Sequence, residues 1–251
     1  MKNIPLLVLL TLLTAPCTYA AFPPEFKAEY TLNKFGLDAA QADISLKKQK
    51  DGSWLYLSQT KTRGIISIFR SDKITEKSVL KIIDGLIKPV DYQYNHKGGG
   101  KNRNRTIHFN WRTGTAESNI SGTQSRLAIP ADTIENFSLQ LRLMNDLQQG
   151  KRVLIYNIIN KGKLKRYNFE ILGNEKVKTP SGEFNAIKFR RTRKNSKRST
   201  IMWAAPELHF LPVKIQHIEK DGATFYMLLS NVSGPITNGK SYSDTRGNEE
   251  E

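Results

Sequence analysis

Residues 26–33, Phe-Lys-Ala-Glu-Tyr-Thr-Leu-Asn, decide the fold, because apolar and polar side chains alternate along the whole stretch. A period of two is typical of a half-buried β-strand. The alternation returns in residues 40–47, Ala-Gln-Ala-Asp-Ile-Ser-Leu-Lys, and Asp51-Gly52 then gives a strong hairpin-turn signal before a third run at 54–62. This part of the chain therefore predicts an antiparallel meander.

Most of the remaining chain repeats this pattern. Further strands are predicted at 65–70, 74–83, 90–94, 107–111, 153–159, 165–172, 184–193, 199–203, 213–219 and 223–230. Hairpins of this kind build a strongly curved sheet or an open barrel. The predicted fold class is therefore mainly β, a curved antiparallel sheet or open β-barrel with one amphipathic helix.

The segment that predicts the helix covers about residues 133–149. Asp132 and Glu135 have the spacing of a capping box, and Gly150 stands where a C-terminal cap would lie. One face of the predicted helix is apolar, with 3-4-3 spacing of Ile134, Phe137, Leu141 and Met144. Because this helix has a single stripe to bury, we expect it at the mouth or on the concave face of the sheet.

Residues 1–20 have the features of a secretory signal peptide: a basic Lys2, an apolar run over 4–13 and small residues before Ala21. We expect cleavage near Ala20 and a periplasmic location, with outer-membrane association left open. One β-rich domain is predicted at 21–234, and the polar residues 235–251 are predicted to be a disordered tail. Two alternatives to cleavage remain, an uncleaved anchor and a lipid on Cys17.

The chain is strongly basic, with 39 Lys and Arg against 23 Asp and Glu and a formal net charge of +16 at pH 7. Such a charge favours polyanionic partners. Export leaves anionic lipid, lipopolysaccharide or an envelope protein as candidate partners and argues against nucleic acid. Cys17 is the only cysteine and would be lost with the leader, so we expect no disulfide.

No residue pattern predicts catalysis, a metal or a cofactor. The four histidines, His96, His108, His209 and His217, lack the spacing of metal ligands. There is no Gly-x-Ser-x-Gly elbow, and the glycines at 98–100 precede a strand rather than the helix that a phosphate loop needs. We therefore expect a protein that is not an enzyme. An envelope hydrolase is the weakest alternative, because the spacing of carboxylates across strands is invisible in a sequence.

Basic clusters are the strongest functional signal. Arg103 and Arg105 share a predicted strand face with aromatic residues, which would suit an amphiphile with an acidic head. The predicted ligand-binding residues are Arg103, Arg105, Phe109, Trp111 and Trp203. The predicted contacts to an anionic surface are Arg190, Arg191, Arg193, Lys194, Lys197 and Arg198. The alternative interpretation is structural, with the cations on a solvated hairpin tip and Trp203 in the core.

Two stretches carry a family resemblance: residues 177–184, Val-Lys-Thr-Pro-Ser-Gly-Glu-Phe, and residues 203–213, Trp-Ala-Ala-Pro-Glu-Leu-His-Phe-Leu-Pro-Val. With them the chain resembles domain-of-unknown-function family 3108, exported bacterial proteins, over about residues 25–230. The resemblance implies an antiparallel β-rich fold, a place in the periplasm or outer envelope and no known cofactor. It implies no activity and no site residues.

Export, a β shell with one helix and basic tips favour a non-enzymatic binder or carrier of an envelope amphiphile such as a lipid, lipoprotein or lipopolysaccharide. The alternative is a packed β scaffold that binds an acidic glycan or a protein partner. A cavity separates these two hypotheses, because a carrier needs an apolar space of several hundred Å³ and a packed sheet has none.

Overall fold

Antiparallel strands form most of the protein, as the alternating sequence predicts. The structure, a computed structural model, describes residues 22–34, 36–64, 67, 71–100, 102–192 and 197–242. The first eight strands are β1 (Phe26–Lys34), β2 (Leu37–Lys48), β3 (Trp54–Thr62), β4 (Asp72–Ile83), β5 (Leu86–Gly98), β6 (Arg103–Asn110), β7 (Thr115–Ile120) and β8 (Thr123–Ala128). The remaining elements are β9 (Ile134–Glu135), α2 (Leu139–Gln148), β10 (Leu154–Asn160), β11 (Lys163–Thr179), β12 (Gly182–Thr192), β13 (Ser199–Ala205), the 3-10 turn η1 (Pro206–Leu208), β14 (Leu211–Ile218), β15 (Thr224–Ser233) and η2 (Pro235–Thr237).

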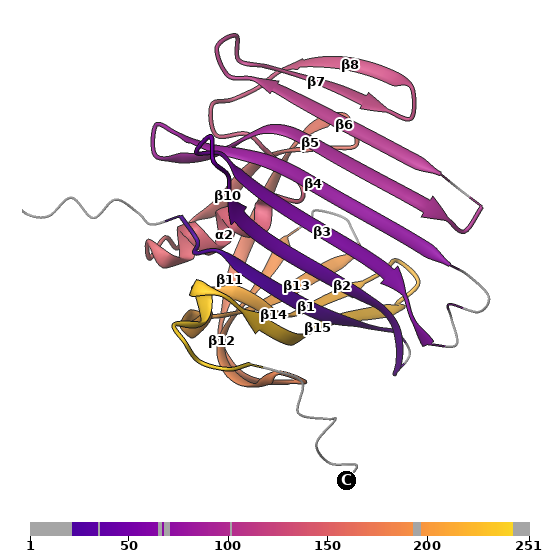
Figure 1. Cartoon of the computed structure of the whole chain (residues 1–251), viewed down its shortest axis with the longest axis vertical. Helices are drawn as coiled ribbons and strands as arrows, with labels where there is room; N and C mark the ends of the chain where they lie inside the picture. Colours follow the sequence, from indigo (N-terminus) through magenta and orange to yellow (C-terminus); the bar gives the residue numbers. More distant parts are fainter. Residues whose placement is uncertain are drawn as a thin grey trace, which may run out of the picture.

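All these strands belong to one sheet, in the order β8-β7-β6-β5-β4-β3-β2-β1-β15-β14-β13-β12-β11-β10-β9 (Figure 1). Every neighbouring pair is antiparallel except β9 with β10, which run parallel. The first and last strands, β1 and β15, therefore pair in the middle of the sheet, and the two halves of the chain extend from them in opposite directions. The predicted fold class, a curved antiparallel sheet or open barrel, is confirmed.

The sheet rolls up until its two ends touch through side chains. Ile159 of β10 is buried in a cluster with Tyr92, Ile107 and Phe109 from the other end of the sheet. The β10–β11 turn comes equally close, because a Cβ added to Gly162 would lie 3.4 Å from Ile120 Cγ1 of β7. No strand pairing joins β8 to β9 among the described residues, so the barrel stays open in its hydrogen bonding.

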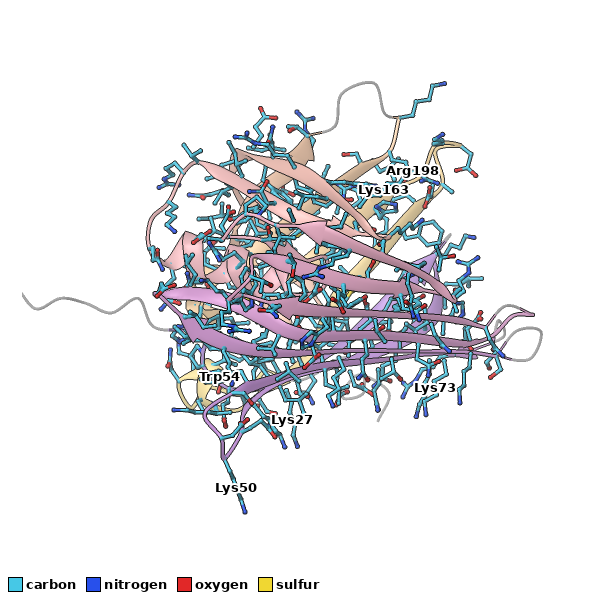
Figure 2. The ribbon with its side chains drawn as sticks, turned by 90° about the horizontal axis from the view of Figure 1, so that it is seen from above. Lys27, Lys50, Trp54, Lys73, Lys163 and Arg198 are labelled. Carbon is cyan, nitrogen blue, oxygen red and sulfur yellow. The ribbon has the colours of Figure 1, made fainter. Side chains whose placement is uncertain are left out.

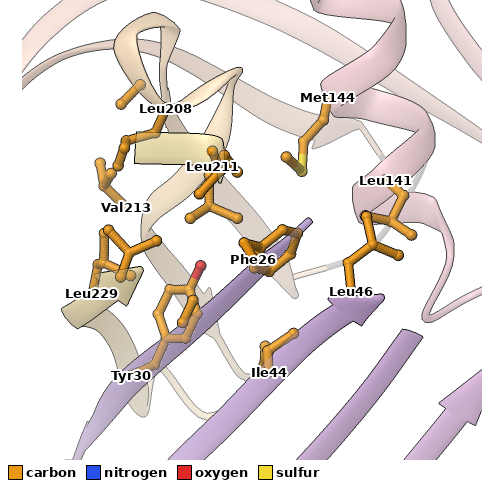
Figure 3. Close-up of a cluster of buried hydrophobic side chains, with 14 of the residues drawn as sticks. Phe26, Tyr30, Ile44, Leu46, Leu141, Met144, Leu208, Leu211, Val213 and Leu229 are labelled. Carbon is orange, nitrogen blue, oxygen red and sulfur yellow. The ribbon is translucent and has the colours of Figure 1, made fainter. Parts of the chain in front are cut away.

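Helix α2 fills one end of the roll, which we call the closed end. Leu141 and Met144 are fully buried and face the cluster that holds Phe26 and Leu46 of the central strands (Figure 3). On its other flank, α2 buries Leu139, Leu143 and Leu147 against β10, β11 and β12. The predicted apolar stripe is therefore buried at Leu141 and Met144, but the helix is apolar on two sides rather than one.

The helix begins later than the sequence predicts. Ile134 and Glu135 form strand β9 against Ile158 and Ile159, so they are not the first helical turn. The Glu135 carboxylate accepts hydrogen bonds from the backbone N–H groups of Phe137 and Ser138 and from the Ser138 hydroxyl, just before α2. The predicted capping box of Asp132 and Glu135 is wrong, since Asp132 instead accepts a hydrogen bond from Asn157, at 2.9 Å.

Two other expectations change, and two cannot be compared with the structure. The sequence does not predict strands β7 and β8, because apolar and polar residues alternate only weakly along them. The predicted tail is ordered over 235–242: Ile236 is fully buried and the Tyr242 ring stacks on Phe184, with centroids 5.5 Å apart. The predicted strand at 65–70, apart from Ser67, and the predicted leader at 1–20 lie outside the described residues.

Candidate functional site

The concave face of the sheet is closed at one end and open at the other. Leu229 of β15 and Val213 of β14 are fully buried at the closed end, near α2. Two residues further along the same face, Met227 and Ile215 are only half-buried, and they pair directly across the two strands. The same gradient follows β1, where Tyr30 is buried and Leu32 is half-buried. Apolar side chains thus remain in contact with solvent inside the roll, toward the end opposite α2, which we call the mouth.

Two adjoining cavities of about 460 and 450 Å³ occupy this open part of the concave face, and we call them together the trough. Both are lined by Leu32, Ile215, His217 and Met227. The cavity nearer α2 is also lined by Phe137, Phe169 and Met202, and the cavity nearer the mouth by Ala40 and Phe225. None of these residues is among the ligand contacts that the sequence predicts.

A half-buried acid, Glu76 of β4, lines the inner cavity of the trough. The Tyr92 hydroxyl donates a hydrogen bond of 2.7 Å to the Glu76 carboxylate. Burial raises the pKa of Glu76, while the hydrogen bond from Tyr92 and the nearby Arg105 guanidinium act in the opposite direction. Glu76 is therefore placed to accept a further hydrogen bond from a polar group in the trough.

Cationic and neutral polar groups line the other side of the inner cavity. The Arg191 guanidinium lies over the Tyr167 ring, 4.5 Å from its centroid. His217 is within hydrogen-bond distance of the Thr200 hydroxyl, at 3.0 Å, and of the Glu219 carboxylate, at 3.3 Å. The trough therefore combines an apolar lining with a small number of polar groups, which is the usual composition of a ligand pocket.

The predicted ligand residues of β6 do share one face, as the alternation indicated. Arg103 is exposed near the mouth, and the Arg105 guanidinium lies 4.6 Å from the centroid of the Tyr94 ring. Phe109 is buried, and the Trp111 ring stacks on it at 5.5 Å and donates to the Pro89 carbonyl at 2.7 Å. The structure thus places Phe109 in the core near the closed end with the half-buried Trp111 packed against it, and none of these four residues lines the trough.

Trp203 lies on the opposite face of the sheet from the trough. Strand pairing connects it to Lys214, whose partner Leu228 points away from the concave face that Met227 lines. The Trp203 side chain is only 3% exposed and lies between the ammonium groups of Lys188 and Lys214, 5.1 and 4.6 Å from the ring centroid. This geometry favours the structural interpretation of Trp203.

The predicted anionic-surface cluster divides into several environments. Arg190 forms an ion pair with Glu170 at 2.9 Å, and Arg198 forms one with Glu219 at 2.6 Å. Arg191 faces the trough rather than the outer surface, and Lys197 is exposed. Arg193 and Lys194 lie outside the described residues. The four described cations therefore do not share one continuous exposed patch.

A separate hollow, of about 700 Å³, lies over strands β5 to β8 on the convex side. Its acids are matched by bases: Asp91 lies 2.8 Å from His108, and Glu117 lies 3.9 Å from Arg126. The polar residues Gln93, Thr106, Asn119 and Gln124 complete its lining. This hollow therefore offers neither an apolar surface nor an excess of positive charge.

Two classes of site have no candidate in the part of the chain that the structure describes. No group of three His, Cys, Asp or Glu side chains there could hold a metal ion. No helix in the same residues is long and apolar enough to cross a membrane.

A family model described as "Protein of unknown function (DUF3108)" matches residues 25–229. Among solved structures, a β-barrel-like protein of family DUF1849 from Brucella abortus is 8% identical, with a TM-score of 0.55 over 85% of this chain and 98% of that one. A putative exported protein with a YmcC-like fold from Bacteroides fragilis is 11% identical (TM-score 0.36, over 85% of this chain and 98% of that one). A putative lipoprotein from Parabacteroides distasonis is 9% identical (TM-score 0.33, 86% and 98%). The first likeness supports the fold alone, and no curated protein matches the chain.

Proposed function

We propose that this chain, which belongs to the DUF3108 family, is a non-enzymatic protein of the bacterial envelope that holds the acyl part of an amphiphile in the trough. The observation that carries the proposal is the half-buried apolar lining of Leu32, Ile215, Phe225 and Met227 around a cavity on the concave face of the sheet.

An apolar lining that stays in contact with water costs free energy, because each buried CH₂ group contributes about 0.8 kcal/mol. A bound acyl chain would recover that free energy and would meet few polar groups in the outer cavity. Glu76, Thr200 and His217 in the inner cavity would then hydrogen-bond to a polar group of the same ligand. The trough thus suits a molecule with a long apolar part and a small number of polar atoms.

The alternative of a packed scaffold has less support. A scaffold would fill its concave face with side chains, whereas the trough leaves two cavities of about 460 and 450 Å³. The polar hollow over β5 to β8 could accommodate a glycan by its size, but its paired charges give an acidic glycan little electrostatic attraction.

Native mass spectrometry of the protein purified from the periplasm, followed by lipid extraction, tests the proposal. We expect a bound species that extracts into organic solvent and a fluorescent fatty acid that competes with it. Ile215 lines both cavities, so Ile215→Trp would place a bulky ring where they adjoin and should weaken both signals strongly. Gln216→Trp is the matched control, because Gln216 is the next residue on the same strand and points to the opposite face. Equal binding by the two variants, or no binding by the wild type, would contradict the proposal.

A further inference from the structure

Positive charge gathers at the mouth of the roll. Six exposed lysines from six different strand ends surround it, and we call them the basic rim: Lys61, Lys73, Lys97, Lys163, Lys197 and Lys220. Figure 2 shows two of them, Lys73 and Lys163, on the side away from helix α2, while Lys50 and Trp54 lie on the helix side. A group of exposed positive charges therefore surrounds the mouth of the roll.

Three of these lysines stand directly side by side. Lys61 of β3 pairs with Lys73 of β4, and Lys73 pairs with Lys97 of β5. Like charges placed directly opposite on neighbouring strands destabilise a sheet. This lysine ladder therefore opposes folding instead of supporting it, and its three side chains are exposed to solvent. Packing gives no reason for the arrangement, whereas an anionic partner does.

The acids near the mouth are already engaged within the protein. Asp72 lies 2.8 Å from His96, Glu219 lies 2.6 Å from Arg198, and Asp38 accepts a hydrogen bond from Asn33. Within the described residues, none of the six lysines of the basic rim has an ion pair with an acid. Asp38 and the exposed Asp221 accept hydrogen bonds only from neutral groups and keep their charge, but the lysines of the basic rim outnumber them, so the field at the mouth is positive on balance.

The closed end differs. Lys88 pairs with Asp84 at 3.1 Å, Lys151 with Asp146 at 2.7 Å and Lys176 with Glu183 at 2.5 Å. Acids at that end thus neutralise three of its cations, whereas Lys47, Lys50 and Lys240 are exposed there and have no ion pair within the described residues. What distinguishes the mouth is the row of three lysines that stand directly opposite one another on β3, β4 and β5.

We propose that the basic rim docks the mouth of the roll onto an anionic bilayer surface. This orientation brings the open side of the trough to the lipid. The docking surface therefore extends the proposed function. It also rests on that function, because uptake of an acyl chain is what would require the mouth, and not the closed end, to face the membrane. Each lysine near an anionic surface strengthens binding by roughly five-fold, and screening by salt limits this attraction to about 8 Å at physiological ionic strength.

The first test is flotation of the mature protein with phosphatidylcholine vesicles that contain phosphatidylglycerol. We expect binding at low salt that falls steeply as salt rises, and no binding to vesicles of phosphatidylcholine alone. The variant with Lys61, Lys73 and Lys97 all changed to Gln should bind about a hundred-fold more weakly. Its melting temperature should stay equal to that of the wild type or rise, because the repulsion within the lysine ladder is removed.

The matched control changes three exposed lysines at the closed end, Lys47, Lys50 and Lys240, to Gln. It removes the same charge from the whole chain and should keep vesicle binding within a few-fold of the wild type. An equal loss in both variants would overturn the proposal, because binding would then follow net charge and not the rim.

A second measurement reports the orientation. Cys17 is the only cysteine of the sequence, so a mature chain cleaved near Ala20 has no native cysteine. A single introduced cysteine is then the only site that a thiol-reactive dye can label. We expect an environment-sensitive dye at Ser71→Cys, near the mouth, to change its emission on vesicle binding, and the same dye at Gln49→Cys, at the closed end, to remain unchanged. The reverse result would contradict the docking orientation.

Two further outcomes distinguish this proposal from an acidic protein partner and from a docking surface that works without an acyl ligand. Binding to soluble polyglutamate but not to anionic vesicles would identify an acidic protein as the partner and would overturn the membrane proposal. Vesicle binding that depends on the rim, in a protein that takes up no fluorescent fatty acid, would support the docking surface and reject the proposed acyl ligand.

Discussion

The Glu135→Gln variant should remove a pH dependence of stability that arises from the buried Glu135 carboxyl, in the segment before α2. Glu135 is fully buried, and burial raises the pKa of its carboxyl from 4.5 to about 7, although hydrogen bonds from Ser138 and Phe137 act in the opposite direction. Between pH 4.5 and 7 the folded chain therefore holds a proton on Glu135 that the unfolded chain has lost.

The sign and size of the effect follow from this difference. Because the folded state binds more protons in this window, the free energy of unfolding falls as the pH rises from about 4.5 to about 7. One pKa unit corresponds to about 1.4 kcal/mol, so the whole window is worth about 3 kcal/mol. For a domain of this size that is roughly 6 to 12 °C in melting temperature.

The assay is thermal unfolding of wild type and Glu135→Gln at a series of pH values between 4.5 and 8. The uncharged amide has no proton to lose, so the melting temperature of the wild type should fall relative to that of the variant as the pH rises, and the difference should level off above pH 7. Glu117→Gln, which changes an exposed carboxyl, serves as the control and should run parallel to the wild type. Parallel curves for wild type and Glu135→Gln would refute the reasoning.

Four shorter predictions concern the helix, Trp203, the basic loop and processing. Leu141→Asp would place an unpaired charge at a fully buried position and should lower the free energy of unfolding by several kcal/mol; a melting temperature within a degree or two of wild type would show that the stripe is exposed. Trp203→Ala should cost about 3 to 5 kcal/mol in urea unfolding while fatty-acid binding by the folded fraction is kept, and loss of binding with unchanged stability would favour a ligand role. Neutralising Arg193, Lys194, Lys197 and Arg198 together should leave the melting temperature unchanged and weaken binding to anionic vesicles, and a variant that binds as well as wild type would remove this loop from the contact surface. The intact mass of the exported protein should correspond to a chain that begins at Ala21, and a diacylglycerol adduct on Cys17 would contradict that.

Sequence patterns predict the strands well where one face of the sheet is apolar. The alternation at Phe26, Ala28 and Tyr30 marks a strand because each of these side chains points into the core. Strands β7 and β8 lack that signal, since much of their surface is polar and exposed. The helix was predicted too long because Ile134 continues its apolar spacing, although pairing with Ile158 holds Ile134 in an extended strand.

The trough could not be found from the sequence. Alternation shows that Ile215, Met227 and Leu229 point to one face of the sheet, but it does not show that Leu229 is covered by the core while Met227 borders a cavity. That difference depends on how far α2 reaches across the concave face, which only the packed structure shows. The aromatic residues near cations predict ligand contacts at Phe109, Trp111 and Trp203, but in the structure all three side chains pack against other residues.

The pairing of β1 with β15 has a consequence for how the chain acquires its structure. Lys27 pairs with Ser233 and Lys34 with Phe225, so the central seam of the sheet joins residues about two hundred positions apart. Contacts of such long sequence separation form slowly, because the entropy of closing a long loop is lost before the contact contributes any favourable free energy. A chain that emerges N-terminus first cannot complete its sheet until the last strand has arrived. During that interval β1 presents an unpaired edge, which is a template for aggregation. We therefore expect the folding of this protein to depend on chaperones that shield the β1 edge, and a truncation just before β15 should give an insoluble product instead of a smaller folded domain.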